Sequence, residues 1–148
     1  MLLTQHAEAE ALFEKLDHES DEADWHDLLG RLVDRLTMHA ALEEEIFYPA
    51  VATLREGKLM AERAREEHAG IVRQLEALRD PHAGKADLER PLAELWRTVQ
   101  DHVAEEEAEM MPQARRLGAG CLRDLARKME ARIQVGEVDY RKVAGTRA

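Results

Sequence analysis

Two stretches of the chain repeat one pattern: His39-Ala-Ala-Leu-Glu-Glu-Glu-Ile-Phe-Tyr-Pro49 and His102-Val-Ala-Glu-Glu-Glu-Ala-Glu-Met-Met-Pro112. In both, a glutamate follows the histidine by four residues and a proline follows it by ten. Another histidine precedes each stretch at nearly the same interval, His6 by 33 residues and His68 by 34. A repeat of this length is typical of a duplicated helical hairpin. The sequence therefore predicts two hairpins, each with two histidines and one glutamate at matching positions.

The composition favours helices and argues against several kinds of partner. Hydrophobic residues make up 45% of the chain and charged residues 35%, with only four prolines and eight glycines. Alanine, leucine, glutamate and arginine dominate, whereas β-branched and aromatic residues, which favour strands, are sparse. A net charge of −10 would repel nucleic-acid phosphates and anionic lipids, so we expect no nucleic-acid or membrane partner. The single cysteine forms no intramolecular disulfide and no stretch approaches the roughly 20 apolar residues of a membrane span, so we expect a cytoplasmic protein.

Capping and breaking residues divide the chain into five predicted helices. Ser20 or Asp21 is a good N-cap for the second helix, and Gly57 is a plausible left-handed residue that ends it. Asp87 is the expected N-cap of the fourth helix. The predicted helices span about 2–17, 21–55, 58–79, 87–118 and 121–135, and residues 137–148 are predicted to form a flexible tail.

Apolar residues recur at steps of three and four positions along the four longer helices. One such stripe, Trp25-Leu29-Leu32-Leu36, continues without a break through His39 and Glu43. A second stripe, Leu88-Leu92-Leu95-Val99, continues in the same way through His102 and Glu106. This period places each stripe on one helix face, which packs against the others. The sequence predicts an all-α, antiparallel up-down four-helix bundle with a short fifth C-terminal helix, formed by residues 1–136 as one domain.

Six polar residues occupy positions on these stripes where leucine is expected. A glutamate in an apolar interior costs several kcal/mol unless it is paired or ligated. The four-residue spacing stacks each histidine on its glutamate, and antiparallel packing brings the histidines of each hairpin to the same height. A single histidine on an apolar face is usually only a hydrogen-bonded core residue, but the duplicated set favours a metal site. The predicted ligands are His6, His39, Glu43, His68, His102 and Glu106.

Several neighbouring residues are predicted to lie outside this site. Glu107 is a rival to Glu106 because a five-residue offset from His102 can also reach inward. Tyr48 is off the stripe, and we do not expect it in the site. The others are expected to be solvated: Glu44, Glu45, Glu105, His18, His26 and His82.

Two prolines lie inside helical patterns. Pro49 and Pro112 each remove a backbone hydrogen bond and crowd the preceding turn. We expect each to kink its helix one to two turns beyond the glutamate, mainly shaping the end of the bundle.

Four imidazoles and two carboxylates form the predicted donor set. No thiolate is included, which excludes an iron–sulfur cluster and a cysteine-rich zinc site. Nitrogen and carboxylate donors suit iron, manganese or zinc. Six protein ligands exceed the need of one tetrahedral ion and suit two octahedral ions bridged by two carboxylates.

The duplicated motif resembles the hemerythrin-like, or HHE cation-binding, domain family from Gln5-His6 to Pro112, and 121–132 resembles a C-terminal helix common in bacterial members. The resemblance implies two iron ions with an oxo or hydroxo bridge. It also implies that the four histidines are terminal ligands and that Glu43 and Glu106 bridge the irons. Oxygen-carrying hemerythrins have a further histidine where this chain has Val72, which argues against reversible oxygen carriage. Ferritin-like proteins place glutamate three residues before histidine, the reverse order.

The sequence leaves three functions open. The favoured one is a non-enzymatic di-iron protein that binds or senses oxygen or nitric oxide, or handles iron. The second is a di-iron oxidase or peroxidase, which the absence of an evident acid–base residue in the stripes disfavours. The third is a metal-free structural or interaction bundle, which would be indifferent to chelators.

Overall fold

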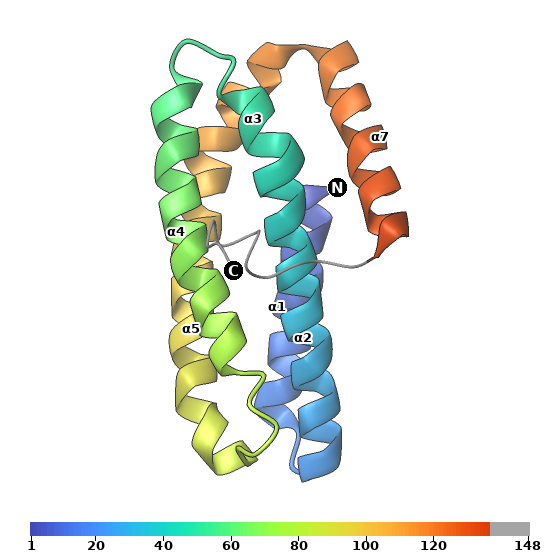
Figure 1. The fold of residues 1–148 in the computed structure, drawn as a ribbon, viewed down its shortest axis with the longest axis vertical. Coiled ribbons are helices and arrows are strands. Elements are labelled where there is room, and N and C mark those ends of the chain that lie inside the picture. The colour runs from blue at the N-terminus through green and yellow to red at the C-terminus, as the bar shows by residue number, and fades with distance from the viewer. Residues whose placement is uncertain (137–148) are drawn as a thin grey trace.

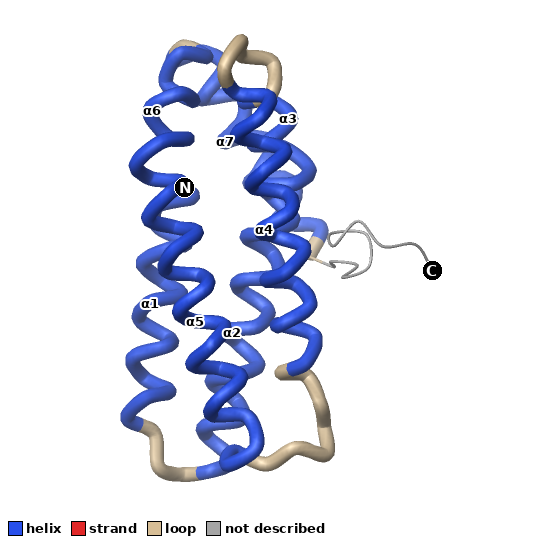
Figure 2. Tube along the Cα trace, turned by 90° about the vertical axis from the view of Figure 1, so that its left-hand side faces the viewer, coloured by secondary structure: helices blue, strands red, loops and turns tan. Residues whose placement is uncertain are grey.

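Four long helices form an antiparallel bundle in the computed structural model, which describes residues 1–136 (Figure 1). The first hairpin consists of α1 (Leu2–His18) and α2 (Glu22–Leu42), and the second of α4 (Gly57–Ala77) and α5 (Lys85–Glu105). Figure 2 shows these helices from the side, without a strand anywhere in the described residues. The predicted all-α bundle is confirmed. The predicted tail, 137–148, lies outside the described residues.

The fifth helix, α7 (Ala119–Val135), runs back along the upper part of the bundle (Figure 1). Glycines with positive φ flank it, Gly118 at 90° and Gly136 at 88°. Such a φ disfavours any residue with a Cβ atom, so glycine suits both ends. Gly120 lies inside α7.

The predicted caps are partly correct. The backbone N–H of Asp24 donates to Asp21 Oδ1 at 2.9 Å, so Asp21 caps α2 as expected. Asp87 does not occupy the N-cap position of α5, which is Gly84, but its carboxylate accepts from the Gly84 N–H at 3.3 Å.

The prediction for Gly57 is wrong. It begins α4 without a positive φ, and a Cβ there would lie 1.9 Å from the carbonyl oxygen of Val51, so glycine is needed for close packing.

The two motif helices are interrupted by π turns just where the motif glutamates lie. These turns are η1 (Glu43–Phe47) and η2 (Glu106–Met110), followed by the short helices α3 (Tyr48–Val51) and α6 (Met111–Ala114) and, after α6, the 3₁₀ turn η3 (Arg115–Leu117). The Tyr48 N–H bonds to the Glu43 carbonyl and the Met111 N–H to that of Glu106, five residues back in both cases. Pro49 and Pro112 follow directly and have no N–H with which to continue an α-helical ladder. The departure from the α-helix therefore begins at the glutamates themselves. The predicted position of the kink, one to two turns beyond the glutamates, is wrong.

The interior contains two apolar clusters separated by a polar layer. The lower cluster fills the end with the α1–α2 and α4–α5 loops and includes Trp25, Leu32 and Leu95. The upper cluster includes Phe47, Val51 and Met129, the last contributed by α7. Across residues 1–136, no helix combines the length and apolar character needed to cross a membrane. The layer between the clusters holds the buried polar side chains His39, Glu43, His68, His102 and Glu106.

Candidate metal centre

The four predicted histidines lie together in this layer with one ring nitrogen of each directed inward. The Nε2 atoms of His6 and His39 are 3.0 Å apart, and those of His68 and His102 are also 3.0 Å apart. His6 comes from the start of α1, and its side chain is 8% exposed. Each hairpin therefore supplies one close pair of imidazole nitrogens.

The opposite ring nitrogen, Nδ1, faces an oxygen in three of the four histidines. His39 Nδ1 donates to Gln5 Oε1 at 2.6 Å, and His102 Nδ1 donates to Glu67 Oε2 at 2.7 Å. His6 Nδ1 lies 2.9 Å from the Glu107 carboxylate. Since these oxygens accept, the proton of a neutral ring sits on Nδ1 and Nε2 presents a lone pair. Two such lone pairs 3.0 Å apart repel unless a proton or a cation lies near them.

The two glutamates connect the hairpins. Glu43 Oε1 lies 3.1 Å from His39 Nε2 and 3.0 Å from His68 Nε2. Glu106 places Oε1 3.3 Å from His6 Nε2 and Oε2 3.3 Å from His102 Nε2. Each carboxylate thus reaches one histidine of each pair, the arrangement expected of a group shared by two positions.

Both carboxylates are almost completely buried, Glu43 at 0% exposure and Glu106 at 3%. Neither oxygen of Glu43, nor Glu106 Oε1, has a hydrogen-bond partner among the described residues. A buried polar atom without a partner costs about 1–3 kcal/mol, and more when it is charged. Cations between these groups would remove this cost and the repulsion between the Nε2 lone pairs, so the residues present fit bound metal ions.

Two overlapping groups of side chains have the spacing of a metal site. The first is His6, His39, Glu43 and Glu106, and the second is Glu43, His68, His102 and Glu106, with donor atoms within 4.8 Å of one another in each. The glutamates belong to both groups, so the geometry accommodates two ions that share two carboxylates. The structure brings all six sequence-predicted residues together.

Tyr48 also lies in this layer, although the sequence analysis placed it outside. Its side chain is fully buried, and its hydroxyl donates to Glu106 Oε2 at 3.1 Å. The same hydroxyl is 3.0 Å from His68 Nε2 and 3.2 Å from His102 Nε2. Burial and the nearby Glu43 and Glu106 charges raise the pKa of the phenol, so it stays protonated at neutral pH.

The π turn is the reason that Tyr48 points inward. In an unbroken α-helix, five residues after Glu43 correspond to a rotation of about 140° away from its face, at about 100° per residue. A turn that takes up one extra residue returns Tyr48 to within roughly 40° of Glu43. A proline soon after a buried glutamate was the one sequence signal for this irregularity.

The charges within the layer stabilise one another. Burial lowers the pKa of His102, but hydrogen bonds to Glu106 and Glu67 outweigh this effect and raise it to about 9. Burial raises the pKa of Glu43, but the charge of the neighbouring His39 outweighs this effect and holds it well below its ordinary value. Protons therefore balance the carboxylate charge when no metal does.

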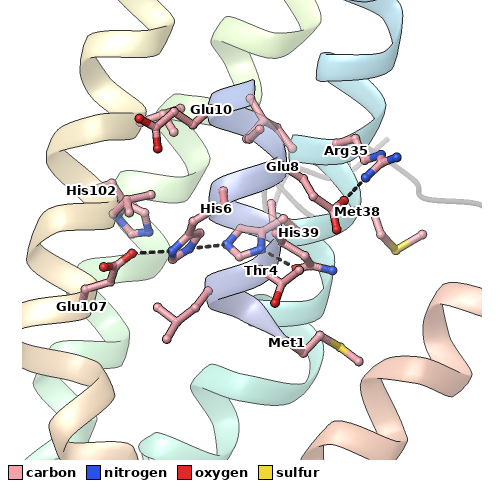
Figure 3. A pocket seen from close by; sticks show the side chains of 18 of the residues that line it. Met1, Thr4, His6, Glu8, Glu10, Arg35, Met38, His39, His102 and Glu107 are labelled. Atoms are coloured by element: carbon pink, nitrogen blue, oxygen red, sulfur yellow. Dashed lines mark hydrogen bonds and ion pairs between the residues drawn. The ribbon is translucent and has the colours of Figure 1, made fainter. Parts of the chain in front are cut away.

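A large cavity reaches the layer from the side of α1 (Figure 3). Its volume is about 1140 Å³, and it is lined mainly by apolar side chains, with all four histidines and Glu107 also among its lining residues. Figure 3 shows the His6 ring between His39 and Glu107, joined to both. A second cavity of about 30 Å³, large enough for water only, touches His102 and Glu106 from the opposite hairpin. Small molecules thus have a route to the inward-facing nitrogens.

The remaining polar residues of the sequence analysis lie around the layer. Glu107 is not inside it: the buried residue is Glu106, while Glu107 contacts the outer edge of His6. Glu44 is only 17% exposed and pairs with Arg65 at 3.2 Å, so it is less solvated than expected. The others stay outside the layer: Glu45 with Arg132, Glu105 with Arg63, His18 with the Glu14 carbonyl, His26 near Glu22, and His82 exposed.

Comparison with known proteins agrees with the geometry. The family model described as the hemerythrin HHE cation binding domain matches residues 1–114. The fold is similar to the crystal structure of a hemerythrin HHE cation binding domain-containing protein from Mycobacterium kansasii, with a TM-score of 0.73 and 26% sequence identity. That match covers 97% of this chain and 85% of the other. No curated protein matches. The chain belongs to the family of hemerythrin HHE cation-binding domain proteins.

Proposed function

We propose that this protein binds two iron ions in the polar layer and uses them to bind or sense a small ligand such as oxygen, nitric oxide or peroxide, or to handle iron. The observation that carries the proposal is the pair of buried carboxylates, Glu43 and Glu106, each lying between two imidazoles and each with an oxygen atom that has no hydrogen-bond partner among the described residues. Such groups are stable in an apolar interior only when positive charge compensates them.

The ligand assignment follows from the two overlapping groups. His6 and His39 would hold one ion, His68 and His102 the other, and Glu43 and Glu106 would be shared. The Tyr48 hydroxyl lies 3.0 Å from His68 Nε2 and would be a further oxygen near the second position. Iron fits a set of nitrogen and carboxylate donors without thiolate, and manganese and zinc are the alternatives.

The residues around the layer have distinct roles in this function. A pair of iron ions supplies redox change and open coordination positions. Gln5, Glu67 and Glu107 orient the imidazoles through Nδ1, which keeps Nε2 inward. Val72 is fully buried and offers no donor, so fewer protein nitrogens occupy the second position than in oxygen-carrying hemerythrins. The apolar cavity beside His6 admits small uncharged ligands.

The decisive experiment is metal analysis of protein purified without added metal. We expect about two ions per chain, with iron identified by its Mössbauer spectrum. Glu43→Ala and His68→Ala should each lose metal, while the matched control His18→Ala, at an exposed site outside the layer, should keep it. Unchanged metal content in both layer variants would overturn the ligand assignment.

An enzymatic function is the second candidate because of Tyr48. Its buried hydroxyl donates a hydrogen bond to Glu106, and the sequence analysis found no such polar group beside the six ligands. Peroxide turnover well above that of free iron, lost in Tyr48→Phe with metal retained, would favour a peroxidase or oxidase. A cytoplasmic location and the lack of nucleic-acid and membrane partners stay predictions from the sequence.

A further inference from the structure

The outer nitrogens of the four histidines face four residues that occupy two repeated positions in the chain. Gln5 and Glu67 each precede the first histidine of their hairpin, and Glu44 and Glu107 each follow the shared glutamate. The first two contact the second histidine of their own hairpin, while the other two face the first histidine of the opposite hairpin. The duplication thus extends beyond the six candidate ligands to the groups that orient them.

At the first repeated position the two hairpins differ in charge but not in shape. Gln5 accepts from His39 Nδ1 through a neutral amide at 2.6 Å, whereas Glu67 accepts from His102 Nδ1 through a carboxylate at 2.7 Å. A carboxylate partner makes an imidazole a stronger electron donor through its other nitrogen. His102 is therefore the better metal ligand of this matched pair.

The residues at the second repeated position, Glu107 and Glu44, do not reverse this difference between the two histidine pairs. Glu107 lies 2.9 Å from His6 Nδ1, but its side chain is 44% exposed, so water screens its charge. Glu44 is 17% exposed but lies 4.0 Å from His68 Nδ1 and also pairs with Arg65. These contacts partly offset each other, so the inequality comes mainly from Gln5 and Glu67.

We propose that Glu67 is a positioning residue that makes the metal position at His68 and His102 the tighter of the two, and that the neutral Gln5 leaves the position at His6 and His39 the weaker. This inference rests on the proposed function because it requires two metal positions. Loading is then stepwise: the position at His68 and His102 fills first, and the position at His6 and His39 fills last.

The test is a titration of the metal-free protein with Zn²⁺ in competition with a chromophoric chelator, which resolves two binding constants. Glu67→Gln should weaken the first, tighter step by on the order of tenfold, the lower end of the cost of losing such a partner. The second step should stay unchanged. The control is Glu66→Gln, an exposed neighbour on the same helix, which should change neither step.

The reverse substitution separates positioning from simple damage to the fold. Gln5→Glu should strengthen the second, weaker step by a similar factor, on the order of tenfold, which a misfolded variant cannot do. Tyr48 is unchanged in both variants, so its contacts with the second pair do not affect the comparison. Circular dichroism of each metal-free variant checks that the helices are retained.

The outcomes distinguish the two proposals. If the wild type binds two zinc ions but Glu67→Gln behaves like Glu66→Gln, the inference fails and the proposed function stands. If Glu67→Gln weakens the second step instead of the first, the order of filling is wrong. If the wild type binds no zinc and is isolated without metal, the proposed function itself fails.

Discussion

The two kinds of interior in this bundle stabilise it in opposite ways. The lower cluster, around Trp25, Leu32 and Leu95, buries apolar side chains that favour folding under any conditions. The polar layer buries carboxylates and imidazoles, some of whose atoms have no partner in the described residues. The first therefore forms the fold, while the second depends on added positive charge. The difference implies that the bundle can fold before metal binds and becomes more stable afterwards.

Metal removal should produce the largest effect, and it acts on the polar layer alone. At a free metal concentration 1,000-fold above the dissociation constant, one site stabilises the folded protein by about 4 kcal/mol. We expect urea unfolding of metal-loaded and chelator-treated protein to differ by at least this amount. Identical midpoints would mean that the layer stabilises itself, as the metal-free structural bundle requires.

Leu32→Ala tests the other interior. Leu32 is 0% exposed, so the loss of its side chain should lower the free energy of unfolding by about 3 kcal/mol. The loss should be the same with and without metal, because the cluster lies apart from the layer. The control Leu59→Ala, at a residue that is 73% exposed, should have little effect. A change in metal stoichiometry in Leu32→Ala would contradict the separation of the two interiors.

The pH dependence should distinguish the metal-free from the metal-loaded layer. The folded-state pKa of His102 is about 9, above its ordinary 6.5, because hydrogen bonds to Glu106 and Glu67 outweigh the opposing effect of burial. Its proton therefore stabilises the metal-free fold fully below pH 6.5, and this stability is lost as the pH rises through 9. Metal must displace the same proton, so affinity should rise across this window by up to about tenfold per pH unit.

Chelator competition at several pH values measures this dependence. The matched variant His102→Gln removes the titrating ring, and the metal-free variant should lose the corresponding decline in stability. A metal affinity that stays level between pH 6.5 and 9 would contradict the assignment of His102 as a proton-bearing ligand.

Tyr48→Phe should have the smallest effect of the set. It removes one hydrogen bond to Glu106 while preserving the packing of the ring, so the free energy of unfolding should fall by about 1 kcal/mol. Urea unfolding measures this loss, and metal analysis should still find two ions per chain. Loss of one ion would show that the phenol oxygen is required as a ligand.

The sequence predicted the fold well because helical periodicity is a local property. The stripe that begins at Trp25 and passes through His39 and Glu43 is visible without any knowledge of neighbouring helices. The same register placed the six polar residues on core positions, and the structure brings them into one layer. Whether all six hold metal stays a prediction that the variants above test.

The features that the sequence analysis missed depend on departures from the α-helix or on packing between helices. Tyr48 is off the stripe of a regular helix and enters the layer only because of the π turn. Gly57 is required by its contact with Val51, which no propensity reveals. The role of Glu67 depends on which way the His102 ring turns and on how closely α4 and α5 pack. None of these is encoded in residue spacing alone.

The two π turns shift the helical register of α2 and α5 at the level of the metal layer. Each π turn contains one residue more than an α-helical turn. The side chains from Tyr48 and from Met111 onward are therefore displaced by one residue from the positions that the register below the turn predicts. Deleting one residue within either turn would leave a regular α-helix whose residues above the turn keep nearly their present orientation, because the π turn already absorbs one extra residue. A deletion elsewhere in the same helices would instead rotate the upper segment by about 100°, so the metal layer is the place where each helix best tolerates the loss of one residue.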